Sequence, residues 1–191
     1  MQECPACATC LKAFKIDGRY DVICSGSLMG INYHEIESNS VGYKEDYTMH
    51  SMDFEEFLWA KGYDAAFVEH LYEKMVTVTP LSNIEMEVLE GLFREYMTIG
   101  GMPAVVNMFI SNNNYSGTLK LQRQLLLDYE EDITKYAQRF DKGKIKNVYD
   151  HISVFLGQDN KKFLISKIAH GARNREYVGT VEWLRDAGII N

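Results

Sequence analysis

The chain has 191 residues, of which 46% are hydrophobic and 12% aromatic, enough to fill a core in one ordinary domain or two small ones. The net charge of −7 argues against a protein that coats nucleic acid over its whole surface. There is no run of about 18 apolar residues and no basic, apolar leader, so we expect no membrane span, no secretory signal and a cytoplasmic location.

The chain begins with a predicted helix over residues 4–15, which ends at Asp17-Gly18. Within it, Cys4, Cys7 and Cys10 have the spacing of metal-binding and iron–sulfur runs. A full metal site needs a fourth ligand, and the only other cysteine lies in the next predicted element. We therefore expect an amphipathic helix with incidental thiols and no bound metal.

The stretch DVICSGS, residues 21–27, follows this helix directly and contains a short apolar run that stops at Ser-Gly-Ser. Residues 20–24 are predicted to form a strand buried on both faces, and Gly26 permits a sharp turn at its end. Because ligands gather at the carboxyl ends of strands in open α/β sheets, Ser25 and Ser27 are candidate site residues. The alternative is an ordinary strand followed by a turn.

The spacing of apolar residues changes at Asp53. Before it, alternation over residues 43–52 predicts one further short strand. After it, the spacing is that of helices, with a helix near residues 54–59 and another that starts near Asp64. Ser82 to Glu85 forms a predicted capping box. The helix that this box opens is expected to bury Val88, Leu89, Leu92, Phe93 and Tyr96, and the preceding helix has Phe67, Leu71 and Met75 on one face.

Gly100-Gly101 predicts a chain reversal, and Pro103 suits the first turn of the helix that follows. Thr118 can cap a long helix that reaches Tyr136, and Asp141 begins another.

Two short helices are predicted near the carboxyl terminus, over residues 165–169 and 174–187, with a turn at Gly171. This arrangement is typical of a helix-turn-helix or of a winged helix without its wing. From Lys161 onward there are six basic residues against three acidic ones, so this end carries +3 and the rest of the chain −10. The candidate nucleic-acid-binding residues are Lys161, Lys162, Lys167, Arg173 and Arg175. Chance segregation of charge, and a fold used for packing or protein contacts, are the alternatives.

Several stretches occur in an order that resembles prokaryotic AAA-type P-loop ATPases with a carboxyl-terminal domain of unknown function. These stretches are DVICSGS, MDFEEFLWAKG, GGMPAVV, LLDYEEDITKYA, NKKFLISKIA and REYVGTVEWLRDAGII. The resemblance implies a mixed but mostly α fold, in which a remnant of a parallel α/β P-loop sheet precedes a helical region and a winged-helix-like segment. The implied domains are residues 1–52, 53–110 and 111–191.

The resemblance also implies ATP and magnesium as cofactors of the full-length family, with Ser25 as a sensor of the γ-phosphate and Ser27 beside it. The phosphate-binding motif G-x-x-x-x-G-K-[ST] is absent, and residues 2–5 resemble those that follow the Walker B acidic pair. Where relatives often carry Gly-Arg, this chain has Gly42 and then Tyr43. We therefore expect a catalytically incomplete ATPase fragment to which neither cofactor binds well.

Three functional hypotheses follow from the sequence. The first is the truncated ATPase, whose relatives couple ATP binding to a conformational change. The second is a winged-helix module that binds DNA or a protein client, with self-association as a further possibility. The third is a reading frame shortened by a frameshift or a late start, with no role of its own.

Overall fold

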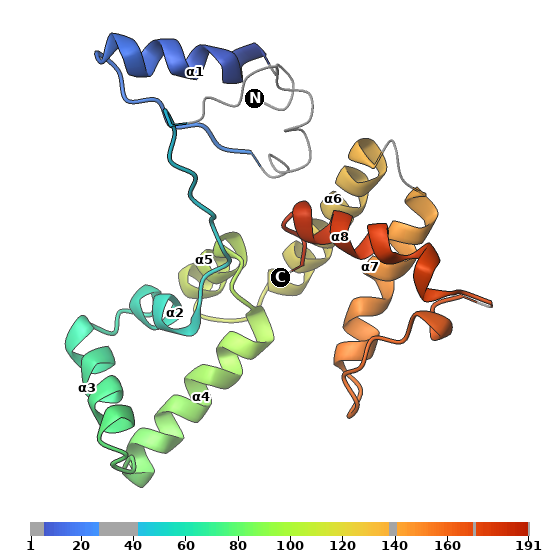
Figure 1. Cartoon of the computed structure of the whole chain (residues 1–191). Coiled ribbons are helices and arrows are strands. Elements are labelled where there is room, and N and C mark those ends of the chain that lie inside the picture. The colour runs from blue at the N-terminus through green and yellow to red at the C-terminus, as the bar shows by residue number, and fades with distance from the viewer. Residues whose placement is uncertain (1–5, 27–41, 138–140, 170, 191) are drawn as a thin grey trace. The chain divides into compact units, whose positions relative to one another are not determined.

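The structure, a computed structural model, describes residues 6–26, 42–137, 141–169 and 171–190. The described elements are α-helices and short 3-10 turns, with no strand among them (Figure 1). The chain divides into two compact units, residues 48–128 and residues 1–47 with 129–191. None of the described helices combines the length and the apolar composition needed to cross a bilayer. The prediction that the chain is mostly helical is correct, because the described elements are helices and 3-10 turns.

The prediction of a remnant parallel α/β P-loop sheet is wrong for the described residues. Helix α1 (Ala6–Asp17) is followed by a segment without regular structure over residues 19–26, where a buried strand was expected. Ile23, at the centre of the expected strand, is 96% exposed. Residues 44–53 also form no strand. The physical reason is that a strand is stable only when its backbone pairs with a neighbour, and the described residues offer none.

The unit of residues 48–128 consists of four helices and the first half of a fifth. They are α2 (Phe54–Ala60), α3 (Ala65–Val76), α4 (Asn83–Ile99), α5 (Pro103–Asn112) and α6 (Thr118–Tyr136). The predicted capping box at Ser82 and Glu85 is confirmed, and Asp53 forms a second one at the start of α2. The core of this unit is made of Phe57, Leu58, Val68, Leu92, Ile99, Val105, Val106 and Phe109. Of these buried residues, α3 contributes only Val68.

Within this unit, the reversal between α4 and α5 is hydrogen-bonded to the segment that precedes α2. Gly100 has φ 70° and ψ −175°, a backbone conformation open essentially to glycine alone. The Gly101 carbonyl accepts a 2.7 Å hydrogen bond from the Met52 amide, and the Met52 carbonyl accepts one of 2.9 Å from the Tyr96 hydroxyl. A Cβ atom at Gly101 would lie 2.0 Å from the Met52 carbonyl oxygen. Glycine at position 101 therefore permits the close approach of two backbone segments.

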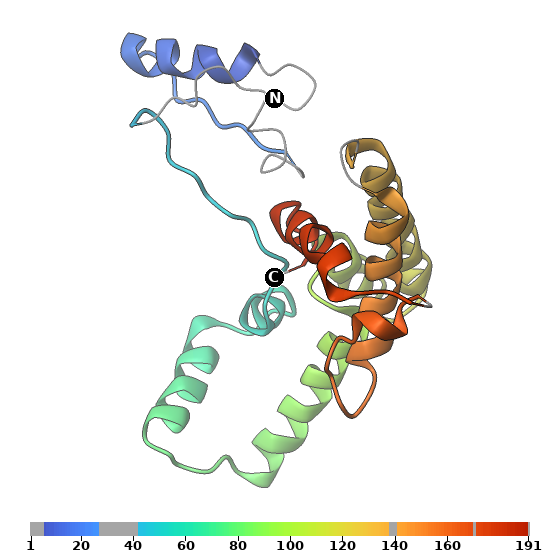
Figure 2. The same cartoon turned by 45° about the vertical axis from the view of Figure 1, so that its right-hand side comes forward.

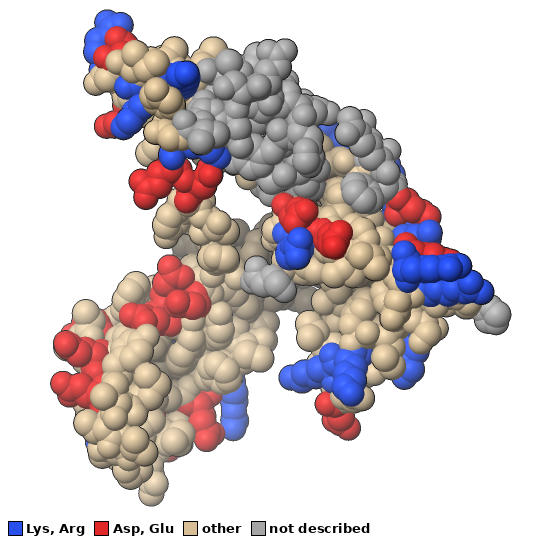
Figure 3. Space-filling model, viewed as in Figure 1, with Lys and Arg blue, Asp and Glu red and all other residues tan. Residues whose placement is uncertain are grey.

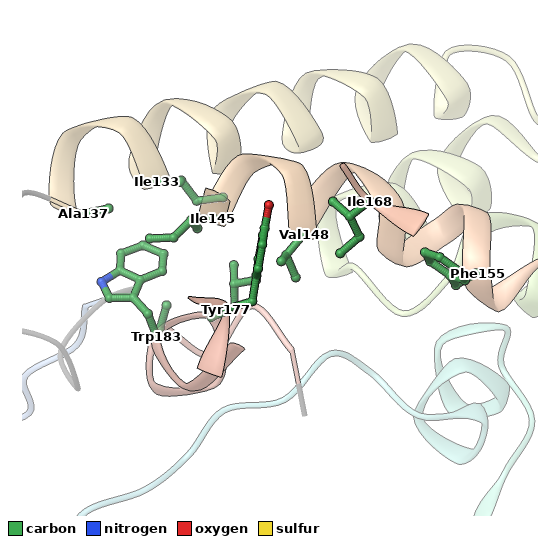
Figure 4. Close-up of a cluster of buried hydrophobic side chains, with 10 residues drawn as sticks. Ile133, Ala137, Ile145, Val148, Phe155, Ile168, Tyr177 and Trp183 are labelled. Atoms are coloured by element: carbon green, nitrogen blue, oxygen red, sulfur yellow. The ribbon is translucent and has the colours of Figure 1, made fainter. Parts of the chain in front are cut away.

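The carboxyl-terminal core is shown in Figure 4, where Trp183 and Tyr177 lie with Ile145 and Val148 of α7 (Lys142–Leu156). The predicted helix 165–169 is a 3-10 turn, η2 (Ile165–Lys167). The predicted helix 174–187 is divided into η3 (Asn174–Glu176) and α8 (Val178–Asp186). The division falls at the buried Tyr177, whose φ of −117° and ψ of −1° are not those of an α-helix. In the described part of this unit there is no strand to serve as a wing.

Candidate functional site

Of the two serines predicted to face a nucleotide, the structure describes one, and no sheet edge lies around it among the described residues. Ser25 is exposed in the irregular segment that follows α1, and Ser27 lies outside the described residues. A phosphate sensor requires a hydroxyl held rigidly at the end of a strand, next to a phosphate-binding loop. The structure does not give Ser25 that setting.

The cysteine run is partly described. Cys7 and Cys10 are exposed on α1, Cys24 is exposed beyond it, and Cys4 lies outside the described residues. Among the residues that the structure describes, no group of three or more His, Cys, Asp and Glu side chains is close enough to hold a metal ion.

The five predicted nucleic-acid contacts are all exposed and lie on three short segments. Lys161 and Lys162 precede η2, Lys167 ends it, and Arg173 and Arg175 flank the start of η3. None of the five forms an ion pair with another described residue. On the face seen in Figure 3, Lys and Arg side chains over α7 and the segments around it gather in separate groups.

Helix α8, which forms most of the predicted helix 174–187, presents a surface that is not basic. Trp183 and Leu184 are buried against α7. The exposed residues of α8 are Val178, Val181 and Glu182, together with Arg185 and Asp186, which form an ion pair of 3.2 Å. Two valines, a carboxylate and an arginine already paired with an aspartate offer poor contacts to the acceptor-rich edges of the bases and to phosphates. The candidate basic side chains therefore lie on segments that precede α8 and not on α8 itself.

A groove that the sequence did not predict lies between α3 and α4. The two helices diverge from the loop of residues 77–82, and α2 lies toward their open end (Figures 1 and 2). The groove has a volume of about 730 Å³. It is lined by Phe54 of α2, Leu71, Lys74 and Met75 of α3, residues 78–81 of the loop, and Met86, Leu89, Glu90 and Phe93 of α4. We call this surface the α3–α4 groove.

The walls of the α3–α4 groove are apolar and open to solvent. Met75 is 67% exposed, Phe93 is 49% exposed, and Val78 is 88% exposed. Phe93 and Val88 were predicted to be buried, and both are exposed. The periodicity correctly placed apolar residues on these helices, but it could not show that α3 would stand away from α4. An informative signal was the number of apolar residues on α4, which is more than one buried stripe needs.

Val78 adopts a conformation that is unfavourable for its side chain. It follows α3 with φ 52°, in the left-handed region that β-branched residues rarely enter. Its amide donates to the Met75 carbonyl at 3.3 Å, and the Thr79 amide donates to the Lys74 carbonyl at 2.9 Å. These two bonds form a Schellman motif, in which glycine is the usual residue at this position. Here the motif holds an exposed valine at the rim of the groove.

Two polar contacts between helices fix the position of α3. His70 Nε2 lies 2.7 Å from Glu85 Oε1 on α4, and the Tyr72 hydroxyl donates to Glu55 of α2 at 2.9 Å. Hydrogen bonds from the Ser82 side chain and backbone, and then from His70, lower the pKa of Glu85 to about 2. The hydrogen bond to the Glu55 carboxylate raises the pKa of Tyr72. Polar contacts therefore help to hold α3 against α2 and α4, whereas the other helices of this unit are held together mainly by the shared core.

A protein-family model described as Domain of unknown function (DUF8612) matches residues 90–191, more than half of the chain. No curated protein and no solved structure matches. The matched family is not that of the AAA-type P-loop ATPases, and the described residues contain no strand, so the predicted membership of that ATPase family is wrong. The expectations about ATP and magnesium had only that resemblance as their basis.

Proposed function

Because the chain belongs to the DUF8612 family, whose description states no activity, we propose a function from its surface: a protein-interaction module that binds a partner segment in the α3–α4 groove. The observation that carries this proposal is Val78. An exposed valine in a left-handed conformation lowers stability, and such strain is commonly found where a protein binds a ligand. Here the strained residue forms part of an apolar rim.

The exposed apolar surface supports the same proposal. Met75, Val78 and Phe93 lie around one concave surface, whereas exposed apolar residues on most proteins are scattered singly. Burying apolar surface contributes about 25 cal/mol per Å², so a partner that covers these side chains would gain affinity mainly from their desolvation. The groove volume is within the range of small-molecule pockets, but the large exposed fraction of its walls favours a segment of a protein.

The proposed function is tested with labelled amphipathic helical peptides of about 18 residues, which have a leucine face and a polar face of Lys, Gln or Glu. Fluorescence anisotropy measures their affinities for the full chain and for two variants. Met75→Gln changes an exposed side chain of the groove, and Ile84→Gln changes a comparably exposed residue of α4 that does not line it. We expect at least one peptide to bind, and Met75→Gln alone to weaken that binding. If no peptide binds, or if both variants weaken binding equally, the proposal is wrong.

A second candidate function is contact with nucleic acid through Lys161, Lys162, Lys167, Arg173 and Arg175. Its specific support is that all five are exposed and none is ion-paired with another described residue. The surface of α8 favours phosphate contacts over reading of bases. If all five contact phosphates of duplex DNA, the logarithm of the binding constant falls with the logarithm of salt concentration with a slope of about −4.5. Binding that does not weaken with salt would exclude this function.

A further inference from the structure

We propose that the segment bound in the α3–α4 groove is an amphipathic helix with a polar face of lysine and arginine, an inference that rests on the proposed function.

The unit that contains the groove is acidic. Residues 48–128 include eleven Asp and Glu against five Lys and Arg, and residues 64–99, which contain α3 and α4, include seven against two. Figure 3 shows Asp and Glu side chains beside a largely uncharged surface in the region of α2 and α3. A partner with positive charge is attracted to such a unit, and one with negative charge is repelled.

The two edges of the groove differ in charge. Glu90 lines the groove, and Glu87 is exposed one turn before it on α4. Arg94, one of the two basic residues of residues 64–99, lies 3.3 Å from Glu90, so these two charges offset each other and Glu87 is the carboxylate left at this edge. The other, Lys74, lines the groove on the α3 side. Cations of a bound segment would therefore lie toward the α4 edge, and its apolar side chains between the helices.

The spacing of the groove residues matches a helix of about two turns. On α3 and the loop, Leu71, Met75 and Val78 recur at intervals of four and three residues. On α4, Met86, Leu89 and Phe93 recur at intervals of three and four. With a rise of 1.5 Å per residue, seven residues span about 10 Å, the length over which an incoming helix places two or three apolar anchors.

The kind of backbone also favours a helix. A partner that binds as a strand needs an open sheet edge, and the described residues contain no strand. Segments rich in proline prefer surfaces lined by aromatic rings, but here Phe54 and Phe93 are outnumbered by aliphatic and methionine side chains. Met75 and Met86 are flexible side chains that adapt to the irregular face of a helix. An amphipathic helix therefore fits both the shape and the composition of the walls.

The test compares the three peptides described above at low and at high salt. We expect the Lys peptide to bind about tenfold more tightly than the Glu peptide at low salt, and the difference to shrink as salt screens the charges. Met75→Gln should lower the affinity of the chain for the Lys peptide by about tenfold, and Ile84→Gln should leave that affinity unchanged.

The relative affinities of the three peptides test this inference separately from the proposed function. Equal affinities for the three peptides, or tightest binding of the Glu peptide, would overturn the inference while the groove remained a binding site. Failure of every peptide would overturn both. If Met75→Gln abolished self-association, measured by sedimentation, and left peptide binding unchanged, the occupant would be a second copy of the chain and the inference would be wrong.

Discussion

Replacement of Val78 by glycine is expected to stabilise the protein and weaken its binding at the same time. For an L-residue, the left-handed conformation costs roughly 1–2 kcal/mol, and glycine avoids that cost. Glycine also adds about 0.4–1 kcal/mol of conformational entropy to the unfolded chain, which opposes the gain. Because Val78 is 88% exposed, its removal sacrifices little packing. The net increase in unfolding free energy should therefore be about 0.5–1 kcal/mol.

Urea denaturation followed by circular dichroism measures this change, and the midpoint should rise with an unchanged slope. Val78→Asn is a second variant with the same expected direction, because asparagine tolerates the left-handed region better than valine. Both variants should bind the Lys peptide more weakly than the wild-type chain does. Equal or lower stability of Val78→Gly would refute the assignment of strain, and unchanged binding would refute the role of Val78 at the rim.

Three other predictions concern the rest of the chain. Gly101→Ala forces a backbone contact apart and should lower the unfolding free energy, measured by urea denaturation, by about 2–4 kcal/mol. Gly91 has open space around it on α4, so Gly91→Ala should raise the unfolding free energy by about 0.5–1 kcal/mol. Similar effects of the two variants would contradict the close approach of the backbone at Gly101. Since the pKa of Glu85 is lowered from 4.5 to about 2, its contribution to stability is present above pH 4.5 and is lost as the pH falls toward 2. Urea midpoints across that range should therefore fall more steeply for the wild-type chain than for Glu85→Gln, and parallel curves would contradict the pKa shift. Leu184→Ala should lower the unfolding free energy, measured by tryptophan fluorescence, by about 2–5 kcal/mol. Val181 is partly exposed, so Val181→Ala should lower the unfolding free energy by clearly less. Equal losses of stability would argue against the buried position of residue 184.

The helices of residues 48–128 were predictable because local signals specify them. Asp53 and Ser82 have side chains that cap the helices after them, and Pro103 suits a first turn. These signals act within a few residues, so they can be read from the sequence. Even here Phe93 was placed wrongly, since its burial depends on how closely α3 approaches α4 and not on its own helix.

The strand predicted at residues 20–24 failed for the same kind of reason. Val22, Ile23 and Cys24 have the composition of a buried strand, but pairing depends on another segment of backbone far along the chain. The winged-helix interpretation had the same weakness: Arg173 and Arg175 are exposed as expected, but the surface of α8 became visible only when Trp183 and Leu184 were placed against α7.

The sequence alone determined that the chain is mostly helical, where most helices begin and that its charge is unevenly distributed, because capping, periodicity and composition are local properties. Only the tertiary structure decided which apolar residues are buried, that α3 stands apart from α4, and that Val78 lies exposed in a strained conformation. The conformation of Val78 is set by the local hydrogen bonds of the turn after α3, whereas the other features depend on contacts between segments distant in sequence. The proposed binding groove is one of them, since its walls come from three helices and a loop.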